Sequence, residues 1–118
     1  MTIVDIVNIL IALASIGFGC AGWLAPGYTM NLLDMKDTGS GMGVSEVRAA
    51  SGALFVGAGI GALILWTPAA FAMLGFAWGG AAIGRLTSLI VEGRTSLKLK
   101  FFATEAAIGV LGIWLNLA

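Results

Sequence analysis

The sequence contains no histidine and only one cysteine, Cys20, among its 118 residues. One cysteine cannot form a disulfide within the chain, and zinc sites built from cysteine and histidine need several such ligands. Haem held by a histidine ligand is excluded for the same reason. The carboxylates, methionines and hydroxyls that remain show no metal-ligand spacing. We therefore expect neither a metal nor a cofactor.

Charged side chains are scarce and balanced, with six lysines and arginines against six aspartates and glutamates, or 10% of the chain. Soluble domains have about 25% charged and about 45 to 50% apolar residues. Here 59% of the residues are hydrophobic and the mean hydropathy is +1.03. The sequence therefore predicts an integral membrane protein surrounded by lipid. Without a basic excess, we expect no nucleic-acid partner.

Four apolar runs are each long enough to cross a hydrocarbon core of about 30 Å as a helix. They lie at residues 3–24, 45–66, 68–91 and 97–117. Short links between them predict an all-α fold, a four-transmembrane-helix bundle with up-down topology, as one domain over residues 1–118. Pro26 ends the first span, and residues 28–36 predict a short interfacial half-helix. Ser45 is the expected N-cap of the second span, and Pro68 opens the third.

The basic residues fall on one side of the predicted membrane. Because the spans alternate in direction, the connector after the first span and the turn after the third share a face. That face carries Lys36, Arg48, Arg94, Lys98 and Lys100, whereas the opposite face has no lysine or arginine. The positive-inside rule places the basic face in the cytoplasm and both termini outside.

Small residues recur every four positions on the second and third spans. In lipid, such stripes let helix backbones approach closely, because burying leucine against leucine gains little over leucine against lipid. The positions are Ala49, Ala53, Gly57 and Gly61 on the second span and Gly75, Gly79, Gly80 and Gly84 on the third. One interpretation is packing within the chain. The other is that a stripe contacts a partner or a second copy of the chain.

Arg85 and Glu105 are charged residues inside predicted spans. A charge in hydrocarbon costs about 2.5 to 3.5 kcal/mol on insertion scales, so it usually faces a bundle interior and is paired. Both residues lie about ten positions from the middle of the 92–96 turn, so antiparallel helices would place them at equal depth. With Arg48 and Glu46 they form a predicted intramembrane ionic cluster. The cluster is either a functional site or a structural ion pair, and arginines are also long enough to reach the headgroups.

Other polar residues in the spans predict structural roles. Asn8 and Asn116 lie near the same face of the membrane and are expected to form a hydrogen bond between the first and fourth spans. Thr87 and Thr104 are expected to donate to the backbone of their own helices. None of these four residues therefore needs a functional explanation.

The order of the charged residues carries a resemblance to a known family. Glu46-Val47-Arg48 opens the second span, Gly84-Arg85 precedes Glu92-Gly93, and Glu105 lies in the fourth span. With the Ala25-Pro26 break, this order resembles the domain of unknown function 4345 family of small bacterial four-helix integral membrane proteins. Ser51 departs from the family pattern, which tends to have an aromatic residue there. The resemblance implies the architecture and the charged cluster and, with the charge bias, a bacterial inner membrane protein with periplasmic termini.

Three classes of function remain. The first is a non-catalytic accessory or assembly subunit that packs against a larger membrane protein complex or forms a homo-oligomer, as small size and spare glycine stripes suggest. The alternative is a small oligomeric ion or proton transporter that uses Arg48, Arg85 and Glu105. An enzyme has the least support, because the sequence has no nucleophile with a positioned base and no cofactor motif. We therefore expect a non-enzymatic accessory subunit.

Overall fold

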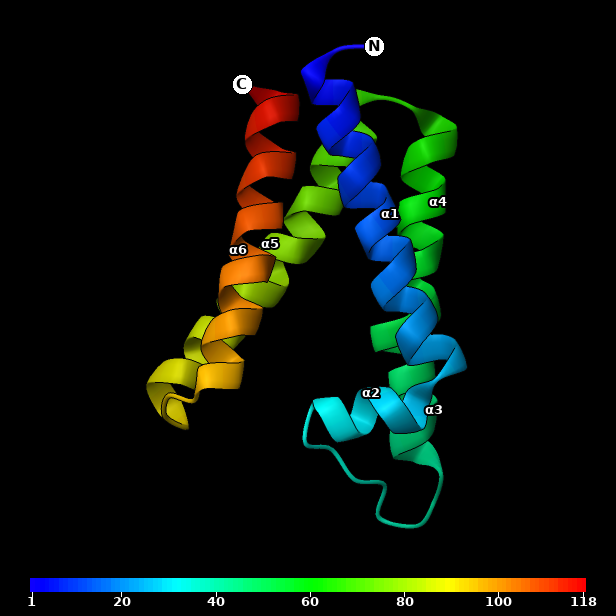
Figure 1. Cartoon of the computed structure of the whole chain (residues 1–118), viewed down its shortest axis with the longest axis vertical. Helices are drawn as coiled ribbons and strands as arrows, with labels where there is room; N and C mark the ends of the chain where they lie inside the picture. Colours follow the sequence, from blue (N-terminus) through cyan, green and yellow to red (C-terminus); the bar gives the residue numbers. More distant parts are fainter. The chain divides into compact units, whose positions relative to one another are not determined.

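The computed structural model describes all 118 residues and consists of helices and their connections. The elements are α1 (Ile3–Leu24), α2 (Pro26–Leu32), α3 (Met42–Arg48), the π-helical turn η1 (Ala49–Ala53), α4 (Leu54–Leu65), α5 (Pro68–Val91) and α6 (Ser96–Leu117). Figure 1 labels the six α-helices. Four stretches are long and apolar enough to cross a membrane: Ile3–Leu24, Met42–Leu65, Pro68–Val91 and Ser96–Leu117. The predicted all-α class with four spans is confirmed, and the chain is a multi-pass membrane protein.

The start of the second span differs from the prediction. Ser45 was the expected N-cap, but α3 begins at Met42, after Gly41 in the left-handed conformation with φ of 81°. Glycine adopts that conformation without steric cost but has no side chain of its own to cap the helix. The first-turn N–H groups of Met42 and Val44 instead donate to the side chains of Ser40 and Asp37, both at 3.1 Å. The third span begins as predicted, because Pro68 occupies its first turn and the Thr67 hydroxyl oxygen accepts the Ala70 N–H at 3.2 Å.

The short helix α2 lies earlier in the chain than the half-helix predicted at residues 28–36. It begins at Pro26 and ends at Leu32. Proline is favoured in the first turn of a helix for two reasons. A backbone N–H at that position would have no intrahelical partner, so its absence costs nothing, and the φ of proline is already helical. Pro26, predicted to end the first span, therefore lies just after the end of α1 at Leu24 and is the first residue of α2.

Asp37 organises the connector between α2 and α3. Its carboxylate accepts backbone N–H bonds from Gly39 at 2.6 Å, from Gly41 at 3.1 Å and from Val44 at 3.1 Å. These hydrogen bonds, the one from Gly39 first, hold the pKa of the Asp37 carboxyl below its usual range because they favour the charged form. The glycine-rich connector thus has a defined path that ends at the start of α3.

The contacts divide the chain into two compact units. The α1–α4 unit consists of Ile9–Ile64, and the α5–α6 unit consists of Met1–Asn8 and Leu65–Ala118. Each unit contains a pair of long antiparallel helices with its own close backbone contacts.

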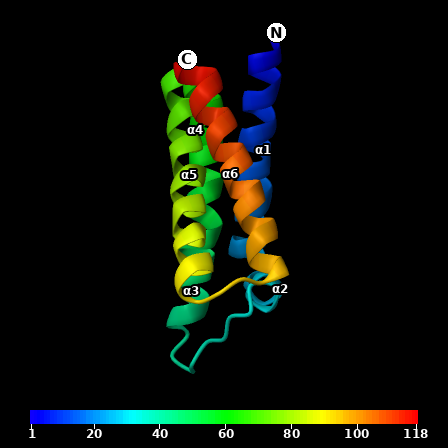
Figure 2. The same ribbon diagram turned by 90° about the vertical axis from the view of Figure 1, so that its left-hand side faces the viewer.

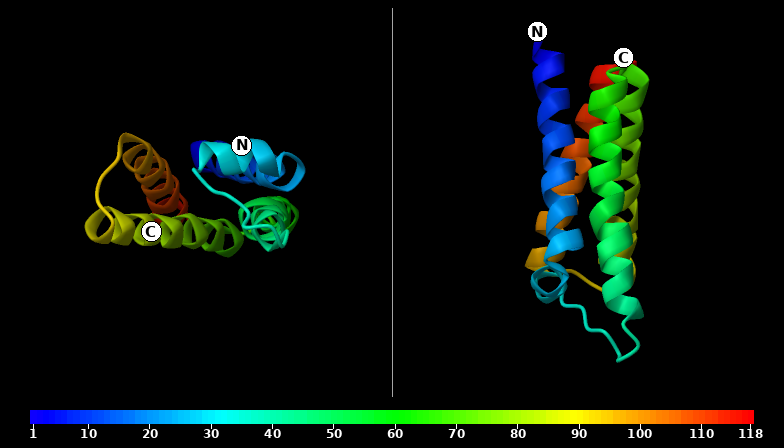
Figure 3. Two further views of the ribbon diagram at one scale, coloured as in Figure 1. Left: turned by 90° about the horizontal axis from the view of Figure 1, so that it is seen from below. Right: turned by 90° about the vertical axis from the view of Figure 1, so that its right-hand side faces the viewer.

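In the α1–α4 unit, glycines bring α1 against the second span. A Cβ on Gly59 would lie 2.7 Å from the Ala12 carbonyl oxygen, and one on Gly19 would lie 2.7 Å from that of Gly52. Gly59 meets the earlier part of α1 and Gly52 the later part, so the two spans run antiparallel. Figure 3 shows them side by side. Gly52 lies inside η1 with φ of −124° and ψ of −105°, where the second span departs from regular helix. The π-helical turn therefore lies at the point of close contact with α1.

In the α5–α6 unit, glycines make the corresponding contact. A Cβ on Gly75 would lie 2.7 Å from the Ile113 nitrogen, and one on Gly109 would lie 2.7 Å from the Gly79 nitrogen. Figures 2 and 3 show α5 and α6 close together towards the carboxyl end of α6 and separated at the turn that joins them. The hairpin is therefore narrow at its glycine contact and wider towards the turn.

The predicted asparagine pair is confirmed. Each of the Asn8 and Asn116 side-chain amides donates to the other's oxygen at 2.8 Å. Asn116 also donates to the Gly112 carbonyl at 2.8 Å. Thr87 and Thr104 likewise donate to the carbonyls of Ile83 and Lys100, as expected.

We predict that Gly109→Ala destabilises the protein by about 1 to 3 kcal/mol, the usual cost of overpacking. The added Cβ would lie 2.7 Å from the Gly79 nitrogen, which belongs to backbone and cannot move cheaply. Gly80→Ala is the matched control, because a Cβ there meets nothing within 4 Å. It should be neutral or stabilise by up to about 1 kcal/mol through helix propensity. Thermal unfolding in detergent, followed by circular dichroism, measures both, and equal midpoints would contradict the contact.

Candidate functional site

The candidate site is an ion pair between the two helices of the α5–α6 unit. The Nε of Arg85 on α5 lies 3.0 Å from Oε1 of Glu105 on α6, and its Nη2 lies 3.2 Å from Oε2. The guanidinium therefore meets the carboxylate through two parallel hydrogen bonds, the strongest geometry for such a pair. The Glu105 side chain is 8% exposed and that of Arg85 is 32% exposed.

The hairpin geometry explains why these two residues meet. Arg85 lies about 9 Å from the end of α5 at Val91, and Glu105 about 14 Å from the start of α6 at Ser96, at 1.5 Å per residue. The pair therefore lies inside the spans, on the side of the glycine contact where the helices have begun to separate. At this level the two helix backbones are too far apart for direct contact, and the long Arg85 side chain spans the gap to Glu105.

Arg85 has a second partner on α6. Its Cζ lies 5.2 Å from the centroid of the Phe101 ring, a cation–π contact. Phe101 and Glu105 are four residues apart, so they share a face of α6. One face of a single helix turn therefore provides both the carboxylate and the ring that surround the guanidinium.

Chemically, the arrangement is a charge pair with its hydrogen bonds satisfied. Arginine remains protonated in proteins, so Glu105 is the acceptor in both bonds. No group of three or more His, Cys, Asp or Glu side chains is placed to hold a metal ion. The pair has the geometry to fix the register of α5 against α6, because a shift of either helix would break both bonds.

Glu46 and Arg48, the other members of the predicted cluster, lie in the α1–α4 unit. Arg48 Nη1 donates to the Trp23 carbonyl at 2.7 Å, close to the carboxyl end of α1. The last carbonyls of a helix lack intrahelical partners, and a cation favours that end of the helix dipole. Glu46 is exposed, and its carbonyl accepts the Ala49 N–H. A cluster of all four charges stays a prediction.

The eight predicted packing residues have different surroundings. Gly75 and Gly79 pack against α6, whereas a Cβ added to Gly57, Gly61, Gly80 or Gly84 would meet nothing within 4 Å. Ala49 and Ala53 are the exposed ends of η1. Sequence reasoning missed several close contacts, made by Gly19, Gly22, Gly52, Gly59, Gly109 and Gly112. Gly52 and Gly59 are seven residues apart, a helical spacing that is visible in the sequence.

The chain belongs to the family described as domain of unknown function (DUF4345), whose sequence profile matches residues 3–116. Comparison with curated proteins and with solved structures found no match. The family supports the fold and, by its own description, names no activity.

We predict that Glu105→Gln destabilises the protein by on the order of 3 kcal/mol, because it leaves the Arg85 charge inside the span without its counter-charge. This loss of stability is at the low end of the range for breaking a buried ion pair, because the Arg85 side chain is partly exposed. The double variant Arg85→Leu with Glu105→Leu should recover most of the loss, since an apolar pair has no charge to compensate. Unfolding by denaturing detergent, followed by circular dichroism, measures each variant. A double variant as unstable as Glu105→Gln would contradict a purely structural pair.

Proposed function

We propose that this family member is a small non-catalytic protein of the bacterial inner membrane, an accessory or assembly subunit that packs against a larger membrane protein complex. The observation that carries the proposal is that glycines at four-residue spacing remain open after the chain has folded. The pairs are Gly57 with Gly61 on α4 and Gly80 with Gly84 on α5.

The contrast between packed and open glycines supports this proposal. Gly75 on α5 touches the α6 backbone, while Gly80 and Gly84 lie on another side of the same helix and are exposed. A glycine inside a helix costs about 1 kcal/mol relative to alanine. For Gly75 that cost is offset by a close helix contact. For Gly80 and Gly84 a corresponding contact would come from another chain.

The side chains around the open glycines add to the argument. Ile83 and Phe76 on α5 are exposed, as are Ile60 and Ile64 around the glycines of α4. Within lipid these side chains gain little by meeting other apolar groups, so association depends on shape and on close backbone approach. Glycine pairs flanked by large side chains provide such a shape for a helix from a partner.

The proposal includes an orientation. Lys36, Arg94, Lys98 and Lys100 lie in the α2–α3 connector, in the α5–α6 turn and at the start of α6. The positive-inside rule assigns these segments to the cytoplasm and both termini to the periplasm.

Purification with gentle detergent from native expression tests the proposal, with bound proteins identified by mass spectrometry. We expect one larger membrane complex in stoichiometric amount. Gly80→Leu with Gly84→Leu should lower its recovery about tenfold, as an overpacking cost of about 1 to 3 kcal/mol implies. Ala107→Leu is the control, because it adds similar bulk at an exposed position of α6 that lacks a glycine pair. Purification of the protein alone, or only as a homo-oligomer, would overturn the proposal.

A second candidate function is a small oligomeric ion or proton transporter. It is favoured by the acid–base pair of Glu105 and Arg85 within the spans, since intramembrane ionisable groups often mark proton paths. Liposomes that contain the protein would then show proton flux above empty liposomes. Glu105→Gln protein with unchanged helical circular dichroism should lose this flux. Flux that is absent in the wild type or unchanged in the variant contradicts transport.

A further inference from the structure

The basic residues of the α5–α6 unit differ in whether they have a partner. Arg85 is bound to Glu105, and the Lys98 ammonium donates to the Gly93 carbonyl at 3.0 Å. Arg94 and Lys100 have no ion pair and no hydrogen-bond partner for their charged groups in the structure. Both are exposed, and both line the same groove. Two uncompensated cations in one groove favour an anionic ligand.

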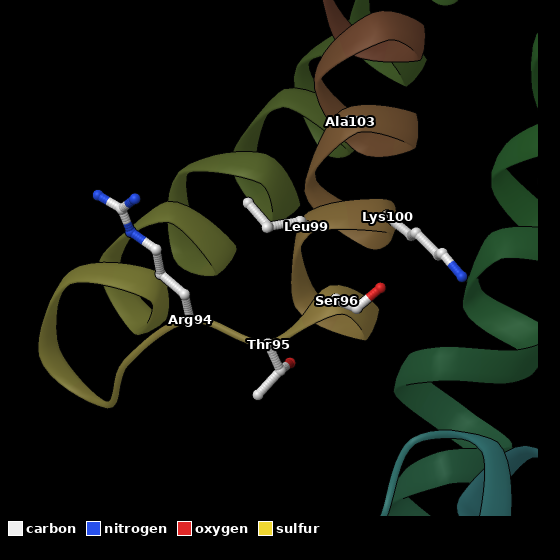
Figure 4. Close-up of a pocket in the computed structure, with 6 residues that line it drawn as sticks. All are labelled: Arg94, Thr95, Ser96, Leu99, Lys100 and Ala103. Carbon is white, nitrogen blue, oxygen red and sulfur yellow. The ribbon is translucent and has the colours of Figure 1, made fainter.

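The groove lies where α6 begins and has a volume of about 560 Å³. Its lining residues are Arg94, Thr95, Ser96, Leu99, Lys100 and Ala103. Figure 4 shows the Arg94 and Lys100 side chains extending to opposite sides, with Thr95 and Ser96 between them. The Thr95 hydroxyl oxygen already accepts the Lys98 N–H at 3.2 Å, so its proton remains free to donate. The lining contains no carboxylate and offers cations and hydroxyl donors, which match a phosphate group.

Beyond the groove, α6 presents an apolar face. Leu99, Ala103 and Val110 recur at spacings of four and seven residues, so they share one side of the helix. Near the far end of α6, Val110, Ile113 and Trp114 line a second, apolar groove of about 400 Å³. Lys100 and Val110 are about 15 Å apart along the helix, which is half of a hydrocarbon core of about 30 Å. A ligand with an anionic head and an acyl chain of one leaflet has this length and this polarity.

We propose that the groove at the start of α6 binds the phosphate-bearing headgroup of an anionic phospholipid, with one acyl chain along α6. The Arg94 and Lys100 side chains, which extend to opposite sides in Figure 4, are long and exposed, so both turn towards the bound headgroup and neutralise it, while the Thr95 and Ser96 hydroxyls donate to phosphate oxygens. The acyl chain lies against Leu99 and Ala103. Basic pockets at the ends of membrane helices recognise lipid headgroups in this way. The site is separate from the Arg85–Glu105 pair and does not depend on the accessory-subunit proposal.

Native mass spectrometry of the full chain tests this site, with equal amounts of phosphatidylglycerol and phosphatidylcholine offered in detergent. We expect phosphatidylglycerol to be retained in preference. Arg94→Gln and Lys100→Gln should each lower that preference about fivefold, the usual effect of one basic residue near an anionic membrane surface. Lys98→Gln is the matched control, because Lys98 lies in the same segment but bonds to Gly93 and does not line the groove. Arg94→Lys keeps the charge and should retain most of the preference.

Three results would overturn the proposal. The first is wild-type protein that retains both lipids equally. The second is an equal loss in Lys98→Gln, which would indicate diffuse attraction instead of a site. The third is displacement of the lipid by the same concentration of inorganic phosphate, which would assign the groove to a soluble anion. Circular dichroism of each variant tests whether the substitutions leave the fold intact.

Discussion

The backbone contact between α5 and α6 at Gly75, Gly79, Gly109 and Gly112 sets the geometry on which the rest of the α5–α6 unit depends. Hydrocarbon provides almost no hydrophobic drive for helices to associate, so packing and hydrogen bonds must hold them together. With no Cβ between them, the two backbones approach closely at this level, and the helices separate towards their turn. Arg85 crosses the wider part and meets Glu105. Glu105, Gly109 and Gly112 share a face of α6 at spacings of four and three residues. The face of α6 that packs closely on α5 is therefore also the face that carries the Glu105 carboxylate.

The same constraint explains the polar groups of both units. In a bilayer, a polar group without a partner within the protein costs several kcal/mol. The Asn8 and Asn116 amides therefore satisfy each other, and Arg48 covers a carbonyl near the end of α1 that its own helix leaves open. No buried side-chain nitrogen or oxygen lacks a hydrogen-bond partner. Among the polar residues that sequence analysis singled out inside the spans, Asn8, Asn116, Arg85 and Glu105 are paired as this constraint requires.

Much of the fold could be predicted because it depends on length and order alone. A run of about twenty apolar residues must span the membrane, and two charges at equal distance from a turn must lie at similar depth. The Asn8 and Asn116 pair could be predicted in the same way, because both residues lie near the ends of their spans at the same face of the membrane. The prediction of Ser45 as the cap was wrong because α3 begins three residues earlier, after Gly41 in a left-handed conformation. Its first-turn N–H groups donate to Ser40 and Asp37, which precede the N-cap position and so give no standard capping signal in the sequence. The π-helical turn at Gly52 was not predicted, since it coincides with close contact to α1 and has no local sequence signal. Glycine spacing gave the candidates for packing, but only the helix partners decide which of them are covered.

The distribution of covered and open glycines bears most directly on function. If glycines served only to pack helices within the chain, the open pair on α5 would destabilise the helix relative to alanine with no compensating contact, because alanine is the better helix former. The groove proposed to bind lipid, in contrast, lies at the start of α6 and is lined by the two cations that the hairpin leaves unpaired. A partner helix on α5 and a lipid on α6 would therefore occupy different helices of one hairpin. The Arg85–Glu105 pair lies between these two helices and holds their register. Because its charges are already matched to each other, the pair fits a structural role between the two proposed surfaces, whereas a transporter would need Glu105 to release this partner.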